Sequence, residues 1–147
     1  MTPKFRAWLL KEKKMVKVSA IFFFSLGKRE GEIMQILYLA ESHMRFLKIL
    51  ADEPNSFVLM QSTGLKDISA KEIYEGDIIE HRYISHLSDE LVVHRFQVVW
   101  DEAYSRFCTQ GLGIKYSVSL SNSRLHFEVI GNIYENPELA SEFVEEE

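Results

Sequence analysis

Four carboxylates lie within residues 71–80: Glu72, Glu75, Asp77 and Glu80. Paired carboxylates can perform acid–base chemistry when burial or a cleft pushes their pKa values apart. The segment, KEIYEGDII followed by Glu80, also fits a turn, because Gly76 can adopt a positive φ and Asp77 can hydrogen-bond to nearby backbone. Ile78 then begins a run of strand-forming residues. We therefore interpret Glu75, Gly76 and Asp77 as a structural turn. We expect the neighbouring glutamates to face water, because side chains alternate along a strand.

Histidines are a second possible source of chemistry, as metal ligands: His43, His81, His86, His94 and His126. None belongs to a ligand motif such as H-E-x-x-H. Residues 77–85 and 91–100 can form a hairpin that turns near residues 87–89. In that register His81 lies opposite Arg95 rather than His94, and a cation is a poor neighbour for a metal ion. We therefore expect no metal site and no cofactor.

Nucleophilic and nucleotide chemistry have little support. The chain has no G-x-S-x-G elbow, and the GLG at residues 111–113 lacks the glycines and lysine of a phosphate loop. The single cysteine, Cys108, follows Phe107 in a predicted strand, so we expect a buried and inert thiol. We predict no catalytic residue and favour a protein that is not an enzyme.

Basic and aromatic residues gather near the N-terminus, where they could contact nucleic acid or a protein partner: Lys4, Arg6, Trp8, Lys11, Lys13 and Lys14. Small barrels bind single strands with such mixtures of stacking and phosphate-binding side chains. The chain as a whole is acidic, with a net charge of -5, so nucleic acid is the second choice of partner. If it binds, its affinity should fall steeply with salt.

Charge and aromatic patterning favour self-association. Residues 4–29 hold eight basic residues and one acid, whereas residues 135–147 hold six glutamates and no base. Either these are solvated faces, or the two ends meet each other or a neighbouring subunit. Three successive phenylalanines, at 22–24, cannot all point inward from one strand. A second subunit or residues 32–50 of the same chain could cover the remainder, and we predict a homo-oligomer.

Strand signals outnumber helix signals and predict a mostly-β fold with minor α, including a small barrel-like antiparallel sheet in the C-terminal part. The expected strands are residues 15–25, 57–61, 77–84, 91–100, 106–109, 114–120 and 125–130. Residues 32–50 fit a helix, or two strands broken around residues 40–43. A short C-terminal helix is expected after Asn136, with Pro137 at its first position and Leu139 and Phe143 facing inward.

A break around Pro54 and Asn55 divides the chain into an N-terminal β-rich region, 1–55, and a C-terminal barrel-like region, 56–147. We expect the two regions to form one compact unit over residues 1–147. The most apolar stretch, residues 18–26, is far shorter than a membrane helix requires. One cysteine permits no internal disulfide, which fits a reducing compartment. These features predict a cytoplasmic protein without a membrane partner.

Three stretches resemble the YopX family of phages and prophages: KFRAW at 4–8 with KKM at 13–15, LMQSTGLKDISAKEIYEGDII at 59–79, and VIGNIYENPEL at 129–139. The chain departs from the family pattern at Leu9, Ser62, Ser69 and Ala70, so the hairpin turn near the last two is expected to be remodelled. The resemblance implies a mostly-β fold, a phage or prophage origin and an intracellular setting in a bacterial host. It implies no catalytic residue. We therefore predict a non-catalytic binding or assembly module, with a host or phage protein as a further possible partner.

Overall fold

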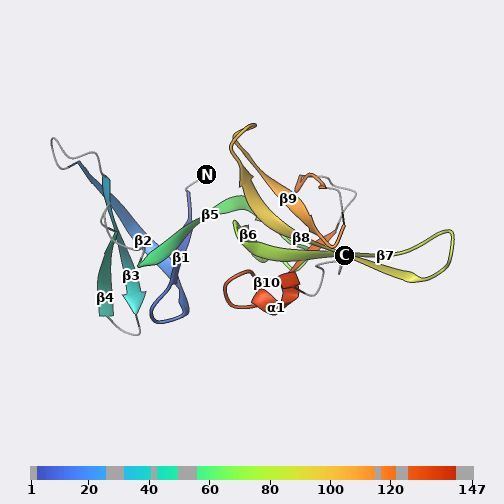
Figure 1. The fold of residues 1–147 in the computed structure, drawn as a ribbon, viewed down its shortest axis with the longest axis horizontal. Coiled ribbons are helices and arrows are strands. Elements are labelled where there is room, and N and C mark those ends of the chain that lie inside the picture. The colour runs from blue at the N-terminus through green and yellow to red at the C-terminus, as the bar shows by residue number, and fades with distance from the viewer. Residues whose placement is uncertain are drawn as a thin grey trace. The chain divides into compact units, whose positions relative to one another are not determined.

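The computed structural model describes residues 3–25, 32–40, 43–49, 56–114, 117–121 and 126–141 (Figure 1). Within it the chain divides into two compact units, Thr2–Gln61 and Ser62–Glu147. The predicted boundary at residues 55/56 falls at the edge of residues 50–55, which lie outside the described part. The mostly-β prediction is confirmed, since ten strands and one short helix make up the described elements.

The N-terminal unit is built on one antiparallel sheet. Its strands are β1 (Phe5–Leu9), β2 (Lys14–Ser25), β3 (Glu32–Ala40), β4 (His43–Ile49) and the first part of β5 (Phe57–Lys66). They lie in the order β4-β3-β2-β1-β5. One face buries the core: Ala7, Leu9, Val16, Ile36, Tyr38 and Phe57. A bulge between Val18 and Ala20 shifts the alternation of β2, so that Ile21 packs on the same core as Val18.

In the segment 32–50, the described residues 32–40 and 43–49 form two strands, so the helix alternative is wrong. The break falls between Ala40 and His43, where the alternative of two strands places it. The apolar residues of this segment fit both periods, but burial follows the period of a strand. Ile36 and Tyr38 are buried whereas Leu39 is exposed, because strand neighbours point to opposite faces.

The C-terminal unit contains the end of β5 and a second antiparallel sheet. Its other elements are β6 (Glu72–Tyr74), β7 (Asp77–Ile84), β8 (Leu91–Asp101), β9 (Arg106–Leu112), β10 (Phe127–Asn132) and α1 (Pro137–Ser141). The second sheet has the order β10-β7-β8-β9. Its core consists of Ile73, Ile79, Phe96, Val98 and Phe127. In the described part of the chain this sheet is open, with β10 and β9 at its edges, so the barrel-like expectation is wrong.

The strand expected at residues 114–120 is also absent. Residues 115–116 lie outside the described part, and residues 117–120 have no strand partner. The Thr109 side chain bonds to this segment instead of a strand backbone. Its Oγ1 accepts from the Val118 N–H at 2.8 Å and donates to the Val118 carbonyl at 2.7 Å. Val118 and its neighbours Ile114 and Leu120 still pack against the core. Their apolar alternation reflects burial without strand pairing.

The C-terminal helix is present as α1, with Asn136 directly before Pro137. Leu139 and Ala140 are half-buried, and no residue of α1 is buried. The Asn136 side chain turns back toward β10, where its Oδ1 accepts from the Asn132 N–H at 3.3 Å. Phe143, the other residue expected to face inward, lies outside the described residues. No helix among the described residues is long and apolar enough to cross a membrane.

The turn expected at Glu75–Asp77 links β6 to β7. Gly76 has a φ of 84°, which a residue with a side chain rarely adopts. Its N–H donates to the Val98 carbonyl at 2.8 Å, and its carbonyl accepts from the Ile133 N–H at 3.0 Å. The turn therefore ties β8 and the segment after β10 to one buried glycine.

Replacing Gly76 should destabilise the fold. Gly76→Val should lower the free energy of unfolding by about 1–3 kcal/mol, because a β-branched residue is strained at this φ. Gly76→Asn is the matched variant, and it should cost less because asparagine tolerates positive φ better. Denaturant unfolding of both variants measures the difference, and equal costs for the two would contradict a requirement for positive φ.

Glu75→Gln is the companion variant. Burial raises the pKa of Glu75, so the folded state gains little from its negative charge and the amide should be tolerated. We expect nearly unchanged unfolding. A Glu75→Gln protein that folds normally but loses a measurable binding or catalytic activity would contradict a purely structural turn.

Candidate functional site

The basic N-terminal residues are not gathered on one surface. Arg6 and Trp8 lie on one face of β1, whereas Ala7 and Leu9 point into the core on the other. Lys14 pairs with Leu9 and so shares the core side of the sheet, at its end. The other candidates lie before β1 or in the turn between β1 and β2: Lys4, Lys11 and Lys13.

The face that carries Arg6 and Trp8 is not an open platform for stacking bases. Both residues are half-buried, and Met60, the partner of Arg6 on β5, is only 1% exposed. Stacking platforms need aromatic faces that a base can reach. The exposed cations on the pairing strands, Lys14 and Lys17, lie on opposite faces of the sheet. Nucleic-acid binding stays a prediction.

Asp67 is a buried carboxylate whose bonds all go to backbone. Its Oδ1 accepts from the Ser69 and Lys71 N–H groups at 2.9 and 2.8 Å. Its Oδ2 accepts from the Val129 N–H on β10 at 3.0 Å. Ala70, within this turn, has a φ of 64°. Two backbone bonds also close this turn, from the Asp67 N–H to the Lys71 carbonyl at 2.8 Å and from the Ala70 N–H to the Asp67 carbonyl at 3.0 Å. Together with the Asp67 side chain they hold alanine at a positive φ.

Two further buried polar residues cap turns in the same way. The Oδ2 of Asp77 accepts from the Tyr74 N–H at 2.8 Å. The Oδ1 of Asn132 accepts from the Tyr134 and Glu135 N–H groups at 3.0 and 2.8 Å, while its Nδ2 donates to Glu135 Oε1 at 3.0 Å. Such bonds give the buried side-chain oxygens the partners that a buried polar group requires. These side chains act on the fold rather than on a substrate.

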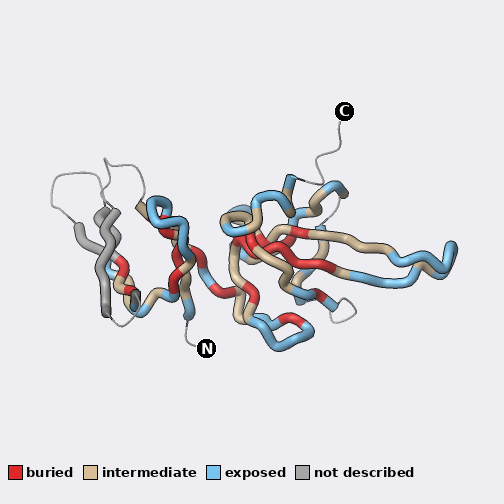
Figure 2. Tube along the Cα trace, turned by 90° about the horizontal axis from the view of Figure 1, so that it is seen from below, coloured by how far each residue is buried: buried red, intermediate tan, exposed pale blue. Residues whose placement is uncertain are grey.

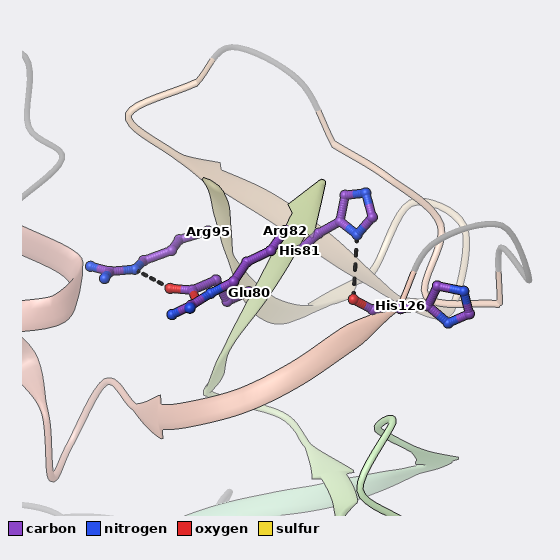
Figure 3. A network of polar contacts seen from close by, with 5 residues as sticks. All are labelled: Glu80, His81, Arg82, Arg95 and His126. Carbon is purple, nitrogen blue, oxygen red and sulfur yellow. Dashed lines mark hydrogen bonds and ion pairs between the residues drawn. The ribbon is translucent and has the colours of Figure 1, made fainter. Parts of the chain in front are cut away.

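The sequence interpretation missed the burial of Glu80. This residue was expected to face water, but it is 2% exposed and lies between two arginines (Figure 3). Arg95, directly opposite on β8, donates from Nε to Glu80 Oε2 at 2.8 Å. Arg82, two residues along β7, donates from Nε to Oε1. The spacing of Glu80 and Arg82 on one strand face was the available signal, but Arg95 is found only with the correct register.

The two arginines determine the charge of Glu80. Burial alone would raise the pKa of its carboxyl, but hydrogen bonds from Arg95 and Arg82 and their positive charges outweigh burial and lower it below the ordinary 4.5. Glu80 is therefore ionised at neutral pH. A folded-state pKa below the unfolded value contributes stability above pH 4.5, and this contribution is lost as pH falls through the folded value. A carboxylate held in this way is a poor general acid.

The register of the β7–β8 hairpin differs by one residue from the predicted one. His81 lies opposite His94, and Arg95 lies opposite Glu80. The loop explains the difference. The Ser85 N–H donates to the Glu90 carbonyl and the Asp89 N–H to the Ser85 carbonyl, both at 2.9 Å, with Asp89 at a φ of 55°. A loop with an even number of residues shifts the pairing by one, which moves every β8 partner to the other face.

The correct register brings histidines and aromatic rings together on the face opposite Glu80. His81 stacks on Tyr83 with 5.4 Å between ring centroids, and Tyr83 meets His94 edge-on at 5.6 Å. His94 contacts Phe96 in turn, and Phe96 lies in the core. His81 Nδ1 lies 3.3 Å from the His126 carbonyl oxygen (Figure 3). These rings join the buried core to the exposed part of the hairpin.

The residue opposite His81 is His94 rather than the expected Arg95, so no arginine lies opposite His81 to disfavour a metal ion. Within the described ranges, no three histidine, cysteine, aspartate or glutamate side chains are grouped so as to hold a metal ion. Burial, and next the positive charge of His81, lower the pKa of His94 below the ordinary 6.5. A metal-free protein stays a prediction.

The outer part of the hairpin, residues 82–94, extends beyond the rest of the sheet and is called the arm. Figure 2 shows it as a long two-stranded projection that changes from buried at its base to exposed at its tip. Large apolar side chains are exposed along it: Tyr83, Ile84, Leu87 and Leu91. Leu87, in the loop, is 100% exposed. The arm is a surface suited to binding, with no convergent reactive groups.

A shallow pocket of about 140 Å³ lies between β9 and residues 117–119. Its lining consists of Arg106, Phe107, Cys108, Ser117, Val118 and Ser119. Cys108 is half-buried rather than buried as expected. Burial and the nearby Asp101 carboxylate raise the pKa of its thiol, so the sulfur stays protonated at neutral pH. The pocket offers no activated nucleophile.

Removing the charge of Glu80 should destabilise the C-terminal unit. Glu80→Gln leaves Arg95 without its anion, and we expect a loss of about 2 kcal/mol. The loss should be below that of a fully buried pair because the Arg82 side chain is 59% exposed. Glu128→Gln is the control, since Glu128 pairs with Glu80 from β10 but is exposed. Denaturant unfolding at pH 7 measures both, and similar stabilities would contradict a structural ion cluster.

His94 should make stability depend on pH. Its folded-state pKa is lowered, so the folded state binds the proton less readily than the unfolded state, and stability should fall as pH drops below 6.5. His94→Gln should lose less stability than the wild type between pH 7.5 and 5.5. His86→Gln, at the exposed loop, should keep the wild-type dependence. Melting temperatures at both pH values decide the matter, and an unchanged dependence in His94→Gln would contradict the assignment.

Comparison with known proteins agrees with this architecture. The model of the family described as YopX protein matches residues 4–141. No curated protein matches the chain. Among solved structures, the chain is similar to the crystal structure of protein EF1440 from Enterococcus faecalis, with 28% sequence identity and a TM-score of 0.57. That match covers 95% of this chain and 99% of the other.

The family match explains the three stretches noted in the sequence. The middle stretch supplies Asp67, Gly76 and Asp77, and the last supplies Val129, Asn132 and Asn136, all of which take part in the turns described above. The matched range begins just before β1 and ends with the last residue of α1, so it covers most of both compact units. The chain therefore belongs to the YopX family.

Proposed function

We propose that this YopX-family chain is a non-catalytic binding or assembly module that forms homo-oligomers. The observation that carries the proposal is the arm, where four large apolar side chains are exposed within thirteen residues. Single exposed apolar residues are ordinary, but a concentration of them typically marks a contact surface. The arm projects from a well-packed sheet, so its apolar side chains are accessible to a binding partner.

The polar residues support a binding role over a catalytic one. The buried carboxylates Asp67 and Asp77 accept backbone N–H groups, and Glu80 is held by two arginines. A catalytic carboxylate needs a proton within reach of a substrate and a pKa near the working pH. The pKa of Glu80 is lowered, away from neutrality. These groups stabilise the unit that carries the arm.

The wider setting follows from the sequence and stays a set of predictions. A phage or prophage origin, the bacterial cytoplasm and a host or phage protein as a further partner belong to this proposal. Participation of the two chain ends in contacts between subunits does too. Nucleic-acid binding by the N-terminal basic residues is the alternative, and no grouping of those residues in the described part favours it.

Light scattering coupled to size exclusion tests the proposal. The purified protein should show a mass above that of one chain, and the mass should increase between a low and a high micromolar loading, because an association driven by exposed apolar surface depends on concentration. Elution in buffers of low and high salt separates apolar from ionic contributions. A mass of one chain at both loadings would contradict self-association.

A further inference from the structure

We infer that the arm is the self-association element and that it packs against the arm of a second copy, antiparallel about a two-fold axis. This inference rests on the proposed function and names the surface and the occupant. A two-fold contact uses the same patch on both copies, so the patch must complement itself. The edges, faces and charges of the arm each meet that requirement.

The arm has two strand edges beyond the reach of its neighbours. β10 pairs with β7 only as far as His81, and β9 pairs with β8 only from Arg95 onward. In the part of the chain that the structure describes, no strand flanks residues 82–94. Exposed edges are usually guarded by charged side chains, especially lysine, or by proline. The arm contains no lysine or proline, and its charged residues, Arg82, Asp89 and Glu90, lie at its base and tip rather than at its middle. Its edges are therefore suited to pairing with another strand.

Both faces of the arm are apolar near its middle. Ile84 pairs with Leu91 on the face that carries Glu80, and Tyr83 pairs with Val92 on the opposite face. Ile84, Leu91 and Tyr83 are all exposed. A second arm lying alongside can contact both apolar pairs, because it has the same two faces.

Charge favours the antiparallel arrangement over a parallel one. Arg82 lies at the base of the arm, where its Nε is bonded to Glu80 but its side chain is 59% exposed. Asp89 and Glu90 lie at the tip and are exposed. When two arms pack antiparallel, the base of each lies beside the tip of the other, so each Arg82 approaches two carboxylates. Parallel packing would instead place tip against tip and bring like charges together.

The size of the surface sets the expected strength. A standard stable interface uses roughly 20–30 residues on each side, and the arm offers thirteen. The contact should therefore be weak, with a dissociation constant in the micromolar range, on the order of 1–100 μM. Such a dimer exchanges with monomer over ordinary working concentrations, so changes to the arm are directly measurable by mass.

Substitutions at the arm test the surface. Tyr83→Ser combined with Leu91→Ser should weaken dimerisation at least tenfold in the concentration required, as should Glu90→Lys at low salt. Phe22→Ser, an exposed aromatic of the N-terminal unit, and Glu102→Lys, in the exposed β8–β9 turn, are the controls and should dimerise as the wild type does. Circular dichroism establishes that each variant is folded. A wild-type protein that self-associates together with arm variants that associate equally well would overturn the inference and leave the proposed function standing.

Disulfide trapping tests the direction of packing. In a Cys108→Ser background, Leu91→Cys lies near the middle of the arm, where a two-fold axis brings the residue close to its own copy. Leu87→Cys lies at the tip, which an antiparallel partner keeps away from the other tip. Mild oxidation should link the Leu91→Cys chains into covalent dimers and leave the Leu87→Cys chains unlinked. The reverse pattern would overturn the antiparallel arrangement, and a wild type that is monomeric at every concentration would overturn both this inference and the proposed function.

Discussion

The turns of the C-terminal unit depend on buried polar side chains that accept hydrogen bonds from the backbone. Asp67, Asp77 and Asn132 supply those acceptors from side chains that are themselves buried. A buried polar side chain without partners is costly, so these bonds stabilise both the side chain and the turn that supplies its donors. The stretches that mark the YopX family contain these residues. In this chain, the middle and last of these stretches supply the turn residues.

With the turns fixed, the β7–β8 hairpin can have different contacts on its two faces. One face buries Glu80 between Arg82 and Arg95, and the other carries rings from Phe96 outward to Tyr83. The ion cluster and the aromatic contacts lie at the same level of the hairpin, where β10 ends its pairing at His81. Both stabilise the point from which the arm extends. A two-stranded projection is marginal alone, and these contacts anchor its base.

Local chemistry made part of this structure predictable. The limits of β7 and the turn at Gly76 follow from a glycine, an aspartate and a run of β-branched residues, all adjacent in the sequence. The register of β7 against β8 does not follow so readily, because one residue more or less in the loop reverses every face. The burial of Glu80 depends on that register, and so it was missed. Residues 32–50 were ambiguous because short apolar runs fit both periods, and only neighbouring strands decide between them.

The bond between Asp67 and Val129 joins residues 62 positions apart, and the neighbouring Ile68 N–H donates to the Phe127 carbonyl. Contacts so distant in the chain must bear the entropy of closing a long loop before they contribute any stability. Pairing between strands that are distant in the chain forms more slowly than pairing within a hairpin. During synthesis, Asp67 in the turn after β5 cannot accept its last hydrogen bond, from the Val129 N–H, until β10 has left the ribosome. The β7–β8 hairpin consists of contacts between residues that are close in the sequence. It can therefore form first and provide the strand on which β10 assembles.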